Sequence, residues 1–137
     1  MSNTVPTAAE GYPNKMQLDL TALSLYELTT VYENLYTVFN VLGGAVNQPR
    51  CYKNDDRTRY NAAGNLLEDV SDMIAEQISA VVREAGTRQP SNERDRGYKF
   101  FLLTADEMWT NVDPEDFLSV TERVIAELPR CDVRVRS

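Results

Sequence analysis

Apolar side chains recur every three or four residues over positions 25–46, the spacing that places them on one face of an α-helix. The repeat consists of Leu25, Leu28, Tyr32, Leu35, Phe39, Leu42 and Val46. Ser24 precedes it and Glu27 follows three residues later, so each side chain can accept a hydrogen bond from a free backbone N–H in a capping box. Leu23 and Leu28 are placed for the accompanying hydrophobic staple. The pattern predicts a first helix with a defined start.

The same spacing returns over residues 60–85 and predicts a second helix. Its apolar face consists of Tyr60, Ala63, Leu67, Val70, Ile74, Ile78, Val81 and Ala85. The connection between the two helices, residues 47–59, is polar and contains Pro49. We therefore expect a loop or a loosely formed helix start there.

Glycines mark the expected ends of both helices. Gly43 and Gly44, followed by Pro49, indicate the end of the first, and Gly86 stands where a left-handed cap would close the second. Gly64 falls inside the second repeat, where glycine costs up to about 1 kcal/mol relative to alanine. We interpret it as part of a frayed first turn. The alternative is a close approach of another backbone segment.

The stretch at residues 98–104 fits two structures. The apolar positions Tyr98, Phe101, Leu102, Ala105, Met108 and Trp109 share one helical face. The same stretch is also a compact aromatic and aliphatic run that suits a buried strand. We favour a helix, because the apolar spacing continues through Asp106 and Glu107, where a strand would need a turn.

A last helix is predicted from strong start signals. Asp113 stands at the cap position, Pro114 at the first helical position, and Glu115 and Asp116 place negative charge at the positive end of the helix dipole. Its apolar face consists of Phe117, Val120, Val124, Ile125 and Leu128. Pro129 ends it.

Two short segments near the termini alternate apolar and polar residues. In residues 14–20 the apolar side chains are Met16, Leu18 and Leu20, and we favour an apolar lead-in to the first helix over a strand. Residues 131–136 alternate in the same way and include Arg134 and Arg136. We favour a basic tail there over an edge strand.

Together these patterns predict an all-α fold, a bundle of about four helices. The expected organisation is a flexible polar lead over residues 1–13, a single helical domain over 14–129, and a short basic tail over 130–137. A mixed α+β fold, with a small sheet formed by 98–104 and 131–136, is the alternative.

Composition narrows the class of protein. The 137 residues suffice for one domain with its own core, and shares of 42% hydrophobic and 26% charged residues are ordinary for a soluble protein. No apolar run is long enough to cross a membrane, and the first residues lack the basic start and apolar block of a secretory signal. We therefore expect a cytoplasmic protein in which Cys51 and Cys131 are free thiols.

The chain contains no histidine, and this excludes several chemistries. Serine and cysteine nucleophiles activated by histidine are ruled out, as is a histidine general base. Two cysteines without histidine are too few for the common zinc sites. We expect no catalytic residues, no metal site and no cofactor.

The net charge of −7 is unevenly distributed, with acidic residues on the predicted helices and basic residues in the connections. If neighbouring helices are antiparallel, one end of the bundle gathers seven basic residues. They are Arg88, Arg94, Arg96, Lys99, Arg130, Arg134 and Arg136. This group is either a patch for an anionic partner or the usual enrichment of basic residues in loops and at helix C-termini. We favour the second interpretation and expect no direct binding to nucleic acid.

Four carboxylates of the second helix, Glu68, Asp69, Asp72 and Glu76, form an acidic stripe opposite its apolar face. Such a stripe is usually the solvated side of an amphipathic helix. Alternatively, the acids imitate the charge of nucleic acid and occupy the basic groove of a partner. Catalysis would instead require inward-pointing acids.

Aromatic residues off the main apolar faces are candidates for a binding surface. Tyr26 and Tyr36 lie beside the first repeat, and Trp109 is the single tryptophan. Aromatic side chains are enriched at protein interfaces. The alternative is a wide core face that includes them.

These observations lead to one main hypothesis, a non-enzymatic protein–protein interaction module. It is expected to form homo-oligomers through the heptad-like face of the first helix. The alternative is an acidic inhibitor that imitates nucleic acid, with the partner surface at Glu68, Asp69, Asp72 and Glu76. A third hypothesis is an enzyme that works without histidine.

Overall fold

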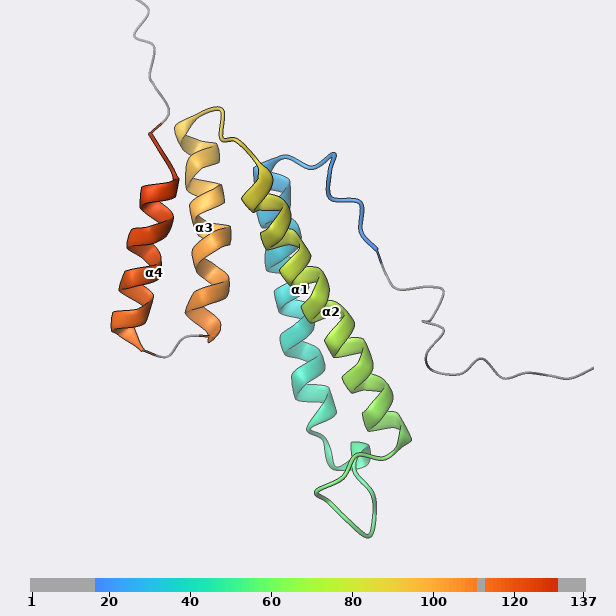
Figure 1. Ribbon diagram of the computed structural model, residues 1–137. Coiled ribbons are helices and arrows are strands. Elements are labelled where there is room, and N and C mark those ends of the chain that lie inside the picture. The colour runs from blue at the N-terminus through green and yellow to red at the C-terminus, as the bar shows by residue number, and fades with distance from the viewer. Residues whose placement is uncertain (1–16, 111–112, 131–137) are drawn as a thin grey trace, which may run out of the picture.

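The computed structural model describes residues 17–110 and 113–130, and its regular elements in these ranges are all helical (Figure 1). The elements are α1 (Leu25–Val46), η2 (Pro49–Cys51), α2 (Ala62–Thr87), α3 (Glu93–Thr110) and α4 (Pro114–Glu127). No strand forms in the described ranges, apart from one isolated bridge between Tyr52 and Tyr60. The prediction of an all-α fold is confirmed.

Consecutive helices run antiparallel and form two hairpins (Figure 1). The long helices α1 and α2 pack along each other, and α3 packs against both of them. Helix α4 packs chiefly against α3. The half of the α1–α2 hairpin nearest η2 extends beyond α3, so that end has two helices rather than four (Figure 1).

Helix α1 starts as predicted. The Ser24 hydroxyl accepts a hydrogen bond from the Glu27 N–H at 3.1 Å, and the Glu27 carboxylate accepts one from the Ser24 N–H at 2.7 Å. The predicted repeat also ends where the helix ends, at Val46. Gly43 and Gly44, interpreted as markers of the end, lie inside the last turns, because glycine lowers helix propensity without ending a helix whose last residue, Val46, is buried.

Helix α2 begins at Ala62, later than the repeat predicts, because the Asn61 side chain accepts a hydrogen bond from the Gly64 N–H at 2.9 Å and caps the helix there. The prediction for Gly86 is wrong. This residue lies inside α2, which ends at Thr87, and its φ is not in the left-handed region.

Gly64 allows a close approach of two backbone segments, which is the interpretation that the sequence analysis did not favour. A Cβ atom at this position would collide with the Cys51 carbonyl oxygen and lie 2.9 Å from Cδ1 of Tyr60. The same carbonyl accepts a hydrogen bond from the Asn61 N–H at 2.9 Å. Gly64 therefore lets the loop after α1 pack onto the first turn of α2.

Two further predictions for the helices are confirmed. Residues 98–104 lie within α3. Helix α4 starts at Pro114, and Asp113 accepts a hydrogen bond from the Glu115 N–H at 3.0 Å. In the described part of the lead-in, residues 17–20, no strand forms, and Leu20 is buried whereas Leu18 is exposed. The predictions for residues 1–13, Met16, Cys131 and the tail at 131–136 lie outside the described residues.

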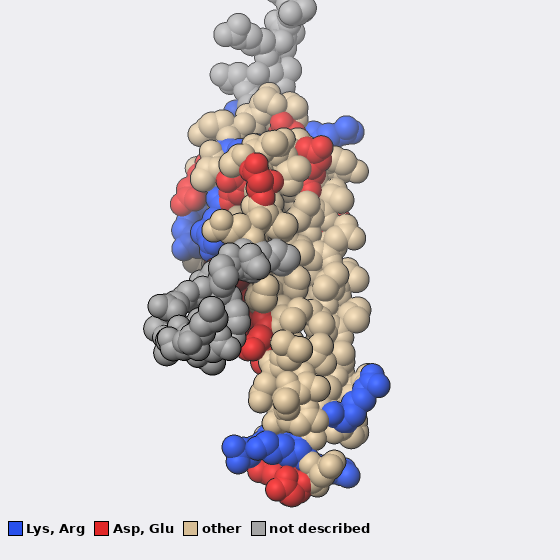
Figure 2. All heavy atoms as spheres, turned by 90° about the vertical axis from the view of Figure 1, so that its right-hand side faces the viewer, with Lys and Arg blue, Asp and Glu red and all other residues tan. Residues whose placement is uncertain are grey.

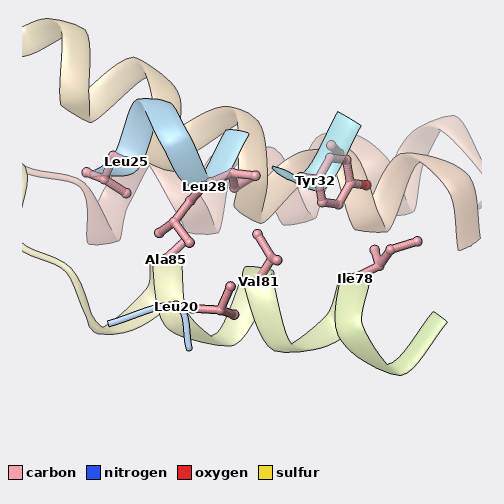
Figure 3. Packing of buried hydrophobic residues seen from close by; sticks show 9 residues of the cluster. Leu20, Leu25, Leu28, Tyr32, Ile78, Val81 and Ala85 are labelled. Carbon is pink, nitrogen blue, oxygen red and sulfur yellow. The ribbon is translucent and has the colours of Figure 1, made fainter. Parts of the chain in front are cut away.

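The core lies where α1, α2 and α3 meet. Leu28, Val81 and Leu102, one from each helix, are its fully buried large side chains. The cluster around them comprises Leu20, Leu25, Tyr32, Ile78, Ala85 and Ala105 (Figure 3). Val124 and Leu128 are buried as α4 packs on α3. The core thus fills one half of the hairpin.

We expect Gly64→Ala to lower the free energy of unfolding by about 1–3 kcal/mol, because the overlap with backbone outweighs the better helix propensity of alanine. Gly43→Ala is the matched control, since a Cβ atom there meets nothing within 4 Å. It should raise stability by up to about 1 kcal/mol. Urea denaturation followed by circular dichroism measures both. Equal effects of the two substitutions would contradict the close approach.

Candidate functional site

A second row of side chains runs along α1 beside the core repeat. It comprises Val31, Asn34, Val38, Val41 and Ala45, spaced alternately by three and four residues. Helix α3 contacts Tyr26, on the other side of the core repeat, and Tyr32 within it, with ring centroids 5.3 Å between Tyr26 and Tyr98 and 6.0 Å between Tyr32 and Phe101. The second row therefore points away from α3.

Helix α2 carries a matching row on the same side of the hairpin. It comprises Leu66, Val70, Met73, Gln77 and Ala80. Several apolar side chains of the two rows are unusually exposed for their size. The exposed fractions are 45% for Val38, 67% for Val41, 64% for Leu66 and 40% for Met73.

We call these ten residues the uncharged hairpin face. None of them is ionisable, and residues 34–49 contain no charged side chain at all. Figure 2 looks onto the side of the hairpin away from α3 and α4, and shows an uncharged column along it. Charged side chains gather beyond both ends of the column, with a mixed cluster at the loop end (Figure 2). Such an apolar surface with a polar surround is typical of interaction sites.

The size of the face fits a binding surface. Each row spans about 21 Å at 1.5 Å per residue, and two adjacent helices are about 20 Å wide, which corresponds to roughly 400 Å² in projection. The largest apolar patches on monomeric proteins measure roughly 300–600 Å² and are often functional. The uncharged hairpin face falls in this range.

The predicted aromatic residues lie elsewhere. Tyr26 is exposed and contacts α3, whereas Tyr36 is half-buried beside the core, with ring centroids 5.9 Å from Tyr32 and 6.1 Å from Phe39. The position of Tyr36 fits the alternative of a wide core face. The side chain of Trp109 lies outside the described part. Their role in partner binding stays a prediction.

The structure leaves Glu68, Asp69, Asp72 and Glu76 exposed on α2. None of them forms an ion pair with a described residue. The four acids are thus a solvated stripe, and a role in partner binding stays a prediction.

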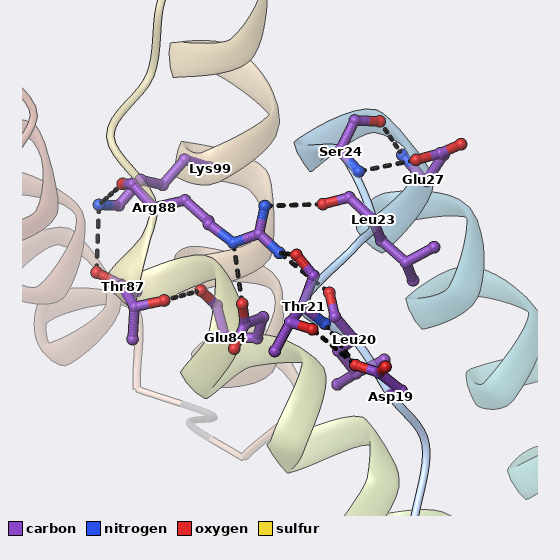
Figure 4. Close-up of polar contacts among 11 residues, drawn as sticks. Asp19, Leu20, Thr21, Leu23, Ser24, Glu27, Glu84, Thr87, Arg88 and Lys99 are labelled. Carbon is purple, nitrogen blue, oxygen red and sulfur yellow. Dashed lines mark hydrogen bonds and ion pairs between the residues drawn. The ribbon is translucent and has the colours of Figure 1, made fainter.

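The predicted gathering of basic residues at one end is confirmed for the described ones, but three of them bind backbone within the chain. Arg88 donates hydrogen bonds to the carbonyls of Leu20 and Thr21, both at 2.9 Å, and of Leu23 at 2.7 Å (Figure 4). Its Nε also donates to the Glu84 carboxylate at 2.8 Å.

Lys99 and Arg96 act in the same way. Lys99 donates to the Arg88 carbonyl at 2.7 Å and to the Gly86 carbonyl at 3.3 Å, while Arg96 donates to the Leu128 carbonyl at 2.9 Å. These carbonyls belong to the last turns of α2 and α4 or follow them, where helical partners are lacking. This fits the interpretation that the basic residues serve helix C-termini.

Tyr32 is a buried polar group that the packing does not satisfy. Its hydroxyl has no hydrogen-bond partner among the described residues. Burial, followed by the nearby Asp106 and Tyr36, raises the pKa of Tyr32 to about 12. Burial and Asp106 also raise the pKa of Tyr36. The buried Tyr32 phenol is therefore neutral, and it affects the stability of the fold rather than a chemical reaction.

No family of known proteins identifies the chain: no protein-family model, no curated protein and no solved structure matches it. Its function therefore has to be argued from its own surfaces.

The other features that could carry chemistry are few. A shallow groove of about 410 Å³ between α1 and α3 is open to solvent and lined by Glu33, Glu93, Arg94 and Tyr98, among others. Cys51 is a buried free thiol whose Sγ donates to the Ala45 carbonyl at 3.3 Å.

Within residues 17–110 and 113–130, no three acidic or cysteine side chains are placed to hold a metal ion. The helices in these ranges are too short or too polar to cross a membrane.

The uncharged hairpin face was not predicted, although the sequence contains two signals for it. The first is a second row at helical spacing beside each core repeat. The second is the absence of charge over residues 34–49, in a chain with 26% charged residues.

We expect Arg88→Met to lower the free energy of unfolding by about 2 kcal/mol or more, because hydrogen bonds from a charged donor are worth about 1.5–3 kcal/mol each. Arg83→Met, at an exposed position of the same helix, is the control and should change stability by less than about 0.5 kcal/mol. Urea denaturation measures both. A similar, small effect of both substitutions would show that the three carbonyl contacts add nothing.

We expect Tyr32→Phe to raise stability by about 1 kcal/mol at neutral pH, because it removes a buried hydroxyl without a partner. The raised pKa of Tyr32 also makes the stability of the parent protein depend on pH. The folded state favours the protonated phenol, so this contribution is complete below pH 10 and is lost as the pH rises towards 12. The variant should therefore lose less stability than the parent between these values.

Urea denaturation at several alkaline pH values tests this, with Tyr26→Phe, at an exposed position, as the control. A parallel pH dependence in the parent and the Tyr32 variant would contradict the assignment.

Proposed function

We propose that this protein is a non-enzymatic interaction module that binds a protein partner through the uncharged hairpin face. The observation that carries the proposal is the exposure of Val38, Val41, Leu66 and Met73 on one continuous surface without charges. Burying such a surface removes apolar area from water and dehydrates no ionised group. Binding therefore gains the hydrophobic contribution at a small desolvation cost.

The heptad-like repeat of α1 is not available for this role over its whole length. Leu25, Leu28, Tyr32 and Val46 are buried within the chain. A partner that used them would have to displace α2 or α3. Self-association stays a prediction, and it requires a face other than this repeat.

The acidic stripe supports a second candidate function, an inhibitor that imitates nucleic acid. Its four exposed carboxylates lie within about 12 Å along α2, or roughly one charge per 4 Å. One strand of DNA carries a charge about every 3.4 Å. This similarity of spacing favours a basic groove as the partner of the stripe.

A photo-crosslinking residue at Val41 tests the main proposal in cells that express the chain. We expect a light-dependent protein adduct, because a partner on the face would lie over this exposed side chain. The same residue at Arg83, outside the face, should give none. Adding Val38→Asp should abolish the adduct, since a carboxylate at the interface would have to be dehydrated.

The two candidate functions predict different effects of substituting the acids of the stripe. Neutralising Glu68, Asp69, Asp72 and Glu76 together, as the corresponding amides, should leave the adduct at Val41 unchanged. An adduct that depends on these acids and not on Val38 would favour the inhibitor. The absence of any adduct at Val41 would contradict the main proposal.

A further inference from the structure

We propose that the partner of the uncharged hairpin face is a second copy of this chain, related by a two-fold axis, so that two α1–α2 hairpins form a four-helix bundle. The axis lies in the interface and perpendicular to the helices, which sets α1 antiparallel to α1 of the second copy. The inference rests on the proposed function, because it uses the same face.

A layer of two helices has two sides, and α3 covers only one side of this hairpin. The other side carries apolar rows spaced alternately by three and four residues on both helices, which is the repeat that interlocks helices in bundles and coiled coils. A second hairpin with identical rows supplies the missing layer, as in the self-complementary interfaces of two-fold dimers.

With a net charge of −7, most contacts between two copies would oppose like charges. The uncharged hairpin face is a surface where two copies can meet without this repulsion. Its neutrality therefore favours a second copy over a strongly charged partner, for which matching charges would be expected.

The charges beyond the ends of the face select the antiparallel arrangement. The loop after α1 carries Arg50, Lys53, Arg57 and Arg59 against two aspartates, whereas the opposite end of the hairpin carries both signs, with Asp19, Glu27 and Glu84 beside Arg83 and Arg88. An antiparallel dimer places the two basic loops at opposite ends of the four-helix bundle. A parallel dimer would place the two basic loops together.

The accessible area of the face is larger than its flat projection, because the side chains protrude from the helices. The face would therefore bury roughly 500 Å² per copy, or about 1,000 Å² in total, which is the lower limit for a specific interface. This area predicts a weak dimer, with a dissociation constant on the order of micromolar. The equilibrium should therefore depend on concentration in an accessible range.

Sedimentation velocity of the full chain from about 1 to 500 μM tests the proposal. We expect a reversible transition from monomer to dimer. Val41→Glu and Leu66→Glu, each at an exposed position of the face, should weaken the dimer at least tenfold. The matched control is Leu118→Glu on α4, because Leu118 has a similar exposed fraction of 58% and lies outside the face. Circular dichroism verifies that all variants fold.

Cysteine crosslinking tests the antiparallel arrangement. Tyr32 lies opposite Ile78 in the hairpin (Figure 3), which places Val38 level with Met73 at the middle of both rows. The two-fold axis then passes beside Val38, so Val38→Cys should link to its own copy in the second chain. Val31→Cys should not, because the two copies of residue 31 would lie about 20 Å apart. Cys131→Ser serves as the background, and equal crosslinking of both positions would overturn the antiparallel arrangement.

The outcomes separate this inference from the proposed function. A chain that stays monomeric at all concentrations, but crosslinks from Val41 to a different protein, overturns the second copy and keeps the interaction module. A monomer without any adduct overturns both. A dimer that Val41→Glu and Leu66→Glu leave intact overturns the inference, because its interface would then lie on another surface.

Discussion

The fold depends on one packing constraint, the burial of Leu28, Val81 and Leu102 at the place where three helices meet. Each side chain comes from a different helix, so the contact fixes α1, α2 and α3 relative to one another. Interiors of this kind are close-packed, and a lost side chain leaves a cavity that neighbours fill only partly. The three residues thus determine which half of the hairpin α3 covers.

The uneven distribution of partners around the hairpin follows from this constraint. One side of the covered half meets α3, while the opposite side meets no other described helix and the extended half meets only the short η2. The exposed side chains of Val38, Val41, Leu66 and Met73 lie where that partner is missing. The acids of α2 lie on other sides of the helix and leave the uncharged hairpin face without charge.

Much of the fold was predictable from the sequence, because local signals and packing agree. The capping box at Ser24 and the cap at Asp113 use hydrogen bonds within a few residues, so the sequence contains the whole interaction. The close approach at Gly64 was not predictable in this way, because the carbonyl that it accommodates comes from Cys51, outside the helix. The role of Arg88 depends on carbonyls more than sixty residues away.

The candidate site was missed for a related reason. A second apolar row beside a core repeat has the same appearance in sequence whether α3 covers it or water does. Which side of α1 faces α3 is decided by contacts such as that of Tyr32 with Phe101, and these are tertiary. Tyr26 and Tyr36 are aromatic residues beside the core repeat, but the sequence does not show which side of α1 faces α3, and both lie on the α3 side.

The contacts of Arg88 join the two ends of the hairpin. Its guanidinium ties the segment before α1 to the last turn of α2, so residues 20–88 form a ring closed by one side chain. Opening that ring exposes the carbonyls of the lead-in, whereas α4, which packs chiefly on α3 and contributes few buried residues, can detach while the ring stays closed. The local stability of the fold is therefore uneven, highest where the ring and α3 share the core and lowest in α4.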